Sequence, residues 1–172
     1  KQQIVDAEAL TREALAGRSY DAVCSAVSQF DVPAVRDVPD VAASLRSLRS
    51  KRDEIEAARR VLSKLPDSSV PTDIIAGLAK VEPVASFLTT DELSPTQARL
   101  DKLLADAISE MAVLLTATTA EAASCAKDQL HSKLTTIDDT LAKFSDYPDT
   151  VQTSRDGLTT RRSEIIANVQ EL

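Results

Sequence analysis

The only histidine of this chain, His131, lies three residues after Asp128, so a helix would place both side chains on one face. An imidazole and a carboxylate at this spacing could provide two ligands to a metal ion. A metal site needs three or four ligands and hydrogen bonds that orient them, and the sequence offers no further ligand at a suitable spacing. We therefore interpret His131 as a surface or partly buried structural residue, and we predict no metal site.

Two pairs of adjacent carboxylates could in principle perform acid–base chemistry: Asp91–Glu92 and Asp138–Asp139. Neighbouring side chains on a helix point about 100° apart, so the two members of a pair would not face each other. Asp91–Glu92 also lies just before a predicted helix start, where negative charge is favourable. We expect all four carboxylates to be solvated or to cap helices.

Cysteine chemistry and nucleotide binding have equally little support. Cys24 and Cys125 lie far apart in the sequence and belong to no metal-binding or redox motif, so we expect two small buried side chains, and a disulfide stays open. The sequence contains no nucleophile elbow, no P-loop and no glycine pattern for a dinucleotide. It therefore predicts a protein that is not an enzyme and that carries no cofactor.

The composition narrows the class of protein further. The net charge of −7 argues against nucleic acid as a partner, because a phosphate backbone needs a cationic surface. The longest apolar run, residues 111–115, is far shorter than the roughly 20 residues that cross a bilayer. There is no Trp, and Phe and Tyr are few, so the core must consist of Ala, Val, Leu and Ile. We expect a cytoplasmic piece of a larger protein, in which residues 1–172 form one helical domain or a short array of repeats.

Apolar residues recur at spacings of three and four throughout the chain, which predicts an all-α fold of antiparallel helical hairpins or a bundle. The clearest start signal is Ser94-Pro95-Thr96-Gln97, where Ser can cap a helix and Pro occupies its first position. Whether the helix that follows breaks at residues 116–119 is open, because Thr118 and Glu121 could form a second capping box. The other predicted helices cover about residues 2–16, 20–30, 39–65, 72–81, 130–144 and 151–172.

An internal repeat is indicated by the three phenylalanines, because Phe87 lies as far along the chain from Phe30 as Phe144 lies from Phe87. Each is predicted to end a short helix and to be buried there, and each is followed by a proline that opens a longer helix. When residue 41 is aligned with residue 151, the segments 41–62 and 151–172 are identical at eight of 22 positions. Coincidence between similar amphipathic helices is the alternative explanation.

If the repeat is real, the chain contains tandem helix-turn-helix units of about 55 residues, with possible units 1–65, 66–117 and 118–172, which stack as in a solenoid. Two such units approximate the length of a spectrin-type three-helix repeat. The chain resembles such repeats only in length and in its helical pattern of apolar residues, since the tryptophan usual in the first helix of such repeats is absent.

The predicted helix at residues 39–65 is locally basic. Its apolar residues form one stripe along the helix: Val41, Leu45, Leu48, Ile55 and Leu62. Four basic residues fall within about 60° of one another, opposite this stripe: Arg46, Arg49, Arg60 and Lys64. They could form a docking strip for an acidic partner, or a plain solvated face in which Asp53 pairs with Arg49 and Glu56 with Arg60. Three further arginines occupy positions of such a stripe: Arg52, Arg59 and Arg162. Their stems could cover a core edge while the guanidinium reaches water or the carboxylate of a neighbouring helix, and the alternative is a contact with a partner.

These patterns favour a non-enzymatic helical module for protein–protein interaction, as in scaffold, cytoskeletal or tethering proteins. Its partners would be proteins, acidic ones if the basic strip docks them, and self-association stays open. The alternative is a helical bundle that carries or senses a lipid or another apolar ligand, because aliphatic bundles with long amphipathic helices can enclose one.

Overall fold

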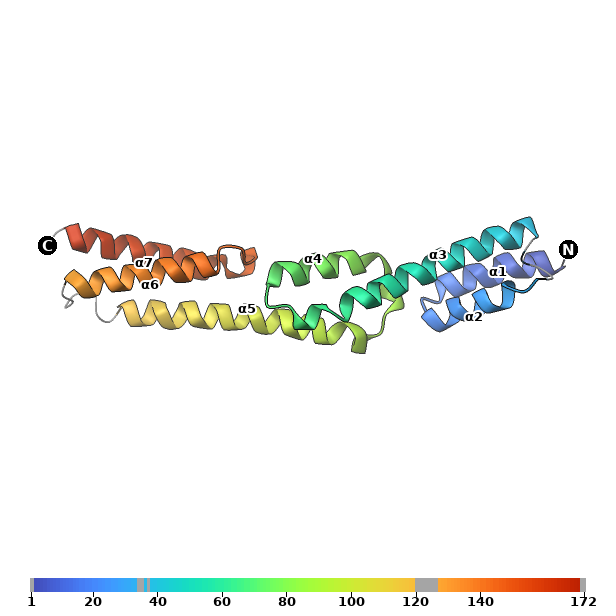
Figure 1. Ribbon diagram of the computed structural model, residues 1–172, viewed down its shortest axis with the longest axis horizontal. Helices are drawn as coiled ribbons and strands as arrows, with labels where there is room; N and C mark the ends of the chain where they lie inside the picture. The colour runs from blue at the N-terminus through green and yellow to red at the C-terminus, as the bar shows by residue number, and fades with distance from the viewer. Residues whose placement is uncertain (1, 34–35, 37, 120–126, 171–172) are drawn as a thin grey trace. The chain divides into compact units, whose positions relative to one another are not determined.

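The computed structural model of the protein describes residues 2–33, 36, 38–119 and 127–170. Within these residues it contains seven α-helices, three short 3-10 helices and no strand, so the predicted all-α class is confirmed (Figure 1). In chain order the elements are α1 (Gln2–Ala16), α2 (Tyr20–Phe30), α3 (Pro39–Leu62), η1 (Leu65–Asp67), α4 (Pro71–Val81), η2 (Glu82–Phe87), α5 (Thr90–Thr119), α6 (Lys127–Lys143), η3 (Asp149–Val151) and α7 (Gln152–Gln170).

The chain divides into two compact units. Unit 1 contains residues 1–67 and 76–96, and unit 2 contains residues 68–75 and 97–172. The first division follows η1, and the other two fall inside α4 and inside α5, so each of these two helices contributes residues to both units.

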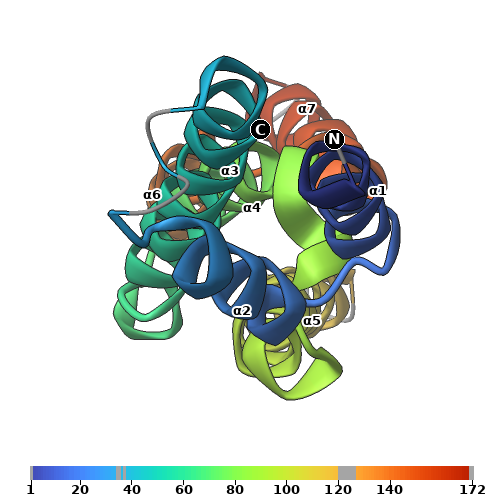
Figure 2. The ribbon, with the colours of Figure 1, turned by 90° about the vertical axis from the view of Figure 1, so that its right-hand side faces the viewer.

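The first core of unit 1 lies between α1, α2 and the first half of α3, which lie side by side in Figures 1 and 2. Ser19 caps α2 as predicted, since its hydroxyl accepts a hydrogen bond from the Ala22 amide. Between α1 and α2, Arg18 has a left-handed φ of 50°, a conformation that favours glycine. The buried residues of this core are Ala14, Val23, Ala26, Val27, Phe30, Val41, Leu45 and Leu48.

The second core of unit 1 forms where the second half of α3 packs against α4 and η2. The predicted stripe on α3 is confirmed, because it supplies the last buried residue of the first core, Leu48, and then the first of the second core, Ile55. At Gly77 of α4 a Cβ would lie 2.5 Å from a side-chain carbon of Leu65, so any larger residue there would force the Leu65 side chain to shift. The buried residues of this core are Ile55, Ala58, Leu62, Val81 and Val84.

The core of unit 2 lies between α5, α6 and α7, and it repeats the aliphatic composition of the other two. Val151 of η3 and Leu158 and Ile165 of α7 are at most 1% exposed, which matches the burial of the α3 residues with which the sequence aligns them. Arg155 of α7 donates to the carbonyls of Phe144 and Ser145 and so caps the end of α6. The buried residues are Ala107, Met111, Leu130, Ile137, Phe144, Val151, Leu158 and Ile165.

The predicted start of α5 at Ser94-Pro95 is wrong, because the helix already begins at Thr90. Thr89 and Glu92 form the start instead: the Glu92 carboxylate accepts hydrogen bonds from the Thr89 amide at 2.7 Å and from the Thr89 hydroxyl at 3.1 Å. Both bonds are donated by Thr89, and the first satisfies an amide that the helix leaves free, which is the glutamate half of a capping box. Pro95 therefore lies inside α5.

The other end of α5 settles the question of a break at residues 116–119, since the helix continues to Thr119. The Thr118 hydroxyl donates to the carbonyls of Leu114 and Leu115 within its own helix, so it does not cap a new one. Glu121, the other member of the expected capping box, lies outside the described residues.

Phe30 and Phe87 are the last residues of the short helices α2 and η2, as predicted, whereas Phe144 directly follows the longer α6, which ends at Lys143. Phe30 and Phe144 are buried, whereas the expectation of burial is wrong for Phe87, which is half-buried. The physical difference is local, because Phe87 ends a 3-10 helix and packs at the edges of both cores of unit 1. The division of the chain into tandem helix-turn-helix units stays a prediction.

Candidate functional site

The residues with potential for metal or nucleophilic chemistry are dispersed. Among the described residues no group of three or more His, Cys, Asp or Glu side chains could hold a metal ion. His131 is exposed on α6, and the side chain of Asp128 lies outside the described residues. Cys24 is a free, half-buried thiol rather than the fully buried one expected, and Cys125 lies outside the described residues.

The two acidic pairs have the structural roles expected of them. Glu92 caps α5 as described above, and Asp91 lies in the same first turn. Asp138 is exposed on α6 and forms an ion pair with Arg162 of α7. Asp139 is exposed as well. Nothing in this arrangement brings two carboxylates together.

The basic strip on α3 is partly neutralised. Arg49 was expected to pair with Asp53, but it forms its ion pair with Asp31, at 2.5 Å, because the turn after α2 places Asp31 beside α3. Arg60 does pair with Glu56, but weakly, at 3.5 Å and with 76% of its side chain exposed. The remaining two residues of the strip, Arg46 and Lys64, are exposed, and neither has a carboxylate partner among the described residues. The Nε of Arg46 donates a hydrogen bond to the Ala42 carbonyl of its own helix.

A second cluster of polar groups lies on the flank of α3 next to the basic strip, and Glu56 belongs to both. Tyr20, the first residue of α2, donates a hydrogen bond from its hydroxyl to Glu56 Oε1 at 3.1 Å. The Arg59 guanidinium lies over the Tyr20 ring at 4.0 Å, and its Nε donates to Glu92 Oε1 at 2.6 Å. Arg52 completes the cluster through Asp53 at 3.0 Å and Glu56 at 3.7 Å. The prediction that these arginines reach a carboxylate of a neighbouring helix is confirmed for Arg59, whereas both carboxylate partners of Arg52 lie on α3 itself.

The ionisation of this cluster follows from its contacts. The Cys24 side chain hydrogen-bonded to Tyr20, then burial and the bond to Glu56, raise the pKa of Tyr20 to about 12. Burial raises the pKa of Glu92, but the hydrogen bonds from Thr89 and Arg59 outweigh it, so the net pKa of Glu92 is lowered. Both groups therefore keep a fixed charge state near neutral pH, which suits a structural contact better than proton transfer.

Sequence reasoning identified Arg52 and Arg59 but missed their assembly with Tyr20 and Glu92. Tyr20 and Arg59 belong to different helices that are far apart in the sequence, and helical periodicity carries no information on contacts at that separation. One signal could have found Glu92: Thr89-Thr90-Asp91-Glu92 has the spacing of a capping box directly before an apolar stripe.

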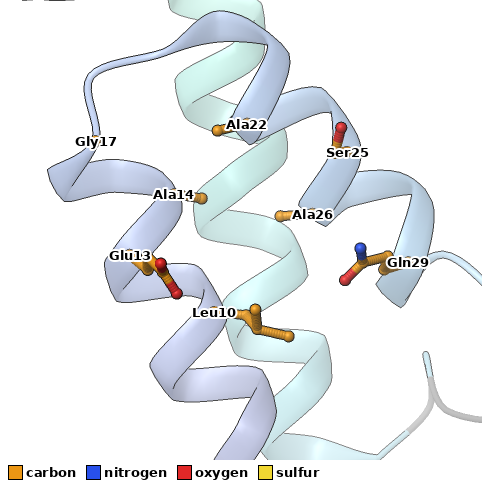
Figure 3. Close-up of a pocket in the computed structure, with 8 residues that line it drawn as sticks. All are labelled: Leu10, Glu13, Ala14, Gly17, Ala22, Ser25, Ala26 and Gln29. Carbon is orange, nitrogen blue, oxygen red and sulfur yellow. The ribbon is translucent and has the colours of Figure 1, made fainter.

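Two open hollows of unit 1 are lined by described residues. One, of about 280 Å³, lies beside the ion pair of Arg59 and Glu92, with Leu62, Ser63, Pro66 and Pro95 as its other lining residues. The second, of about 390 Å³, is a groove between α1 and α2, with α3 behind them (Figure 3). Its floor consists of small apolar side chains such as Ala14 and Ala26, and Glu13 and Gln29 add polar groups.

No described helix is both long enough and apolar enough to span a membrane. Comparisons with protein-family models, with curated proteins and with solved structures give no match for this chain.

Proposed function

We propose that this chain is a non-enzymatic helical interaction module that presents helix faces to a protein partner, as scaffold, cytoskeletal or tethering proteins do. The observation that carries this proposal is the use of α3 by two successive cores, with Leu48 in one and Ile55 in the next. A helix that leaves one core and enters another is how tandem helical repeats extend. It supports a tandem, spectrin-like arrangement of three-helix units.

The surface best suited to an acidic partner is the outer face of α3. Arg46 on α3 and Lys64, two residues beyond the end of α3 at Leu62, keep their charge available, since neither pairs with a carboxylate within the described residues. The paired Arg49 and Arg60 contribute less, because Asp31 and Glu56 already offset their charge. The proposed strip thus binds through its two ends, and its strength depends on salt because exposed charges are screened.

The test is crosslinking of the protein in cells, followed by mass spectrometry, with two variants of equal charge. Arg46→Glu with Lys64→Glu reverses the strip, whereas Lys80→Glu with Lys102→Glu reverses two exposed lysines elsewhere. We expect the first variant alone to lose its crosslinked partner, with the thermal unfolding temperature nearly unchanged. If both variants retain the partners of the wild type, the strip is only a solvated face.

The alternative function, a carrier of an apolar ligand, draws on the groove between α1 and α2, where Leu10 is 38% exposed. Because this groove is small and open on one side, it could hold only part of a lipid chain. Mild organic extraction of the purified protein, with mass spectrometry of the extract, separates the two functions. A stoichiometric lipid would favour the carrier, and a clean extract favours the interaction module.

A further inference from the structure

The two cores of unit 1 are joined by more than the α3 backbone. Between Leu48 and Ile55 two turns of α3 carry no fully buried residue, so the helix alone would leave an interruption between the cores. Two aromatic side chains from other elements flank this stretch: Phe87 of η2 lies beside Lys51, and Tyr20 of α2 lies beside Glu56 and Arg59, just after Ile55.

Tyr20 belongs to a helix of the first core but packs against the second. Its ring lies against the Ile55–Leu62 part of unit 1, with the Arg59 guanidinium 4.0 Å above it. Its hydroxyl reaches Glu56, and Arg59 in turn holds Glu92 at the start of α5. One aromatic residue thereby connects α2, α3 and α5. Interactions of a cation with an aromatic face contribute most where they are partly shielded from water, as here.

Phe87 makes the reverse connection. It belongs to η2, an element of the second core, and it packs at the edges of both cores. Lys51, in the interrupted stretch of α3, places its ammonium 5.9 Å from the ring centre. Its partial burial, which departs from the other two phenylalanines, follows from this position between two cores.

We propose that Tyr20 and Phe87 form a locked joint that couples the two cores of unit 1, so that they open as one cooperative unit. Without the joint, α3 would still connect the cores, but each could unfold locally by itself. With it, opening the first core removes contacts of the second at two places. Residues that share contacts are expected to be energetically coupled, and local opening is measurable by amide exchange. This inference goes beyond partner binding and does not depend on it.

The test perturbs the first core without touching α3 and measures the second. Val27→Ala removes buried volume from α2, and we expect it to speed amide exchange in the first core on the order of tenfold. In the wild-type background the same increase should appear in residues 76–84 of the second core. In the background Tyr20→Leu with Phe87→Leu it should not reach residues 76–84. The matched control, Tyr147→Leu with Phe144→Leu, changes aromatic residues of unit 2 and should leave the coupling intact.

Two outcomes would overturn the proposal. In the first, Val27→Ala speeds exchange in residues 76–84 equally in the wild-type and the Tyr20→Leu, Phe87→Leu backgrounds. In the second, Val27→Ala changes exchange in residues 76–84 in neither background. If the double joint variant does not fold, Arg59→Gln provides a milder change, because it removes the cation over Tyr20 and the bond to Glu92. A second readout is the alkylation rate of Cys24, which lies beside the Tyr20 hydroxyl, in a Cys125→Ser background. Loosening of the joint should raise that rate several-fold, and an unchanged rate in the joint variants counts against it.

Discussion

Replacing Thr96 by valine should stabilise the protein, although it removes a polar group and adds none. Thr96 lies in the N-terminal part of α5 and is completely buried, yet its hydroxyl has no hydrogen-bond partner among the described residues. Two other buried threonines, Thr118 and Thr140, differ in this respect. Thr118 donates to the carbonyls of Leu114 and Leu115, and Thr140 donates to that of Thr136.

The magnitude follows from the cost of burying an unpaired hydroxyl, which is about 1–3 kcal/mol in proteins. Valine has nearly the same shape and a similar helix propensity, so the methyl group that replaces the hydroxyl should fit without rearrangement. We expect Thr96→Val to raise the free energy of unfolding by about 1–2 kcal/mol. For a chain of this size that corresponds to a rise of roughly 2–8 °C in the unfolding temperature.

The assay is urea unfolding followed by circular dichroism, with Thr118→Val as the matched control. The control removes a hydroxyl that is already satisfied, so we expect it to be neutral or to destabilise by about 0.5–1 kcal/mol. If Thr96→Val destabilises the protein, or if both variants change stability equally, the hydroxyl of Thr96 is paired in solution and the reasoning is refuted.

Three further predictions rest on other parts of the fold. Phe144→Ala should cost roughly 3–5 kcal/mol in thermal unfolding and Phe87→Ala clearly less, because only Phe144 is fully buried; equal costs would contradict this ranking. Arg18→Gly should stabilise by about 1 kcal/mol in the same measurement, since it relieves a left-handed φ of 50° between α1 and α2. Tyr20→Phe should reduce the loss of stability in alkali. The pKa of Tyr20 is raised to about 12 in the folded state from its ordinary value of 10.0, so its contribution to stability is intact below pH 10 and falls as the pH rises towards 12. Urea midpoints at pH 8 and pH 11 test this, and an identical decline in both proteins would show that Tyr20 does not contribute.

Much of the fold can be predicted from local patterns, because the residues on the buried face of an amphipathic helix are apolar and recur at spacings of three and four. The stripe Val41, Leu45, Leu48, Ile55 and Leu62 was predictable for this reason, and all five residues are buried. The start of α5 was not, because Ser94-Pro95 carries a valid capping signal and Thr89–Glu92 carries another. Only the competition between them within the folded chain decides which is used.

The polar contacts were predictable only within one helix. The pair of Arg60 and Glu56 follows from i,i+4 spacing, whereas Arg49 pairs with Asp31 from another segment and not with its neighbour Asp53. Partner choice across segments depends on how helices pack, and a single sequence carries no direct signal for it. The contact of Tyr20 with Arg59 belongs to this second kind.

The double use of α3 limits which length changes this protein can tolerate in evolution. Inserting one residue between Leu48 and Ile55 would rotate every later position of the helix by about 100° and translate it by about 1.5 Å. The stripe that packs in the second core would then face away from it, while the first core stayed unchanged. Insertions of about seven residues would restore the register approximately, because they add nearly two complete turns. Length variation among descendants of this sequence should therefore collect in the turns, and inside α3 it should occur in steps of about seven residues.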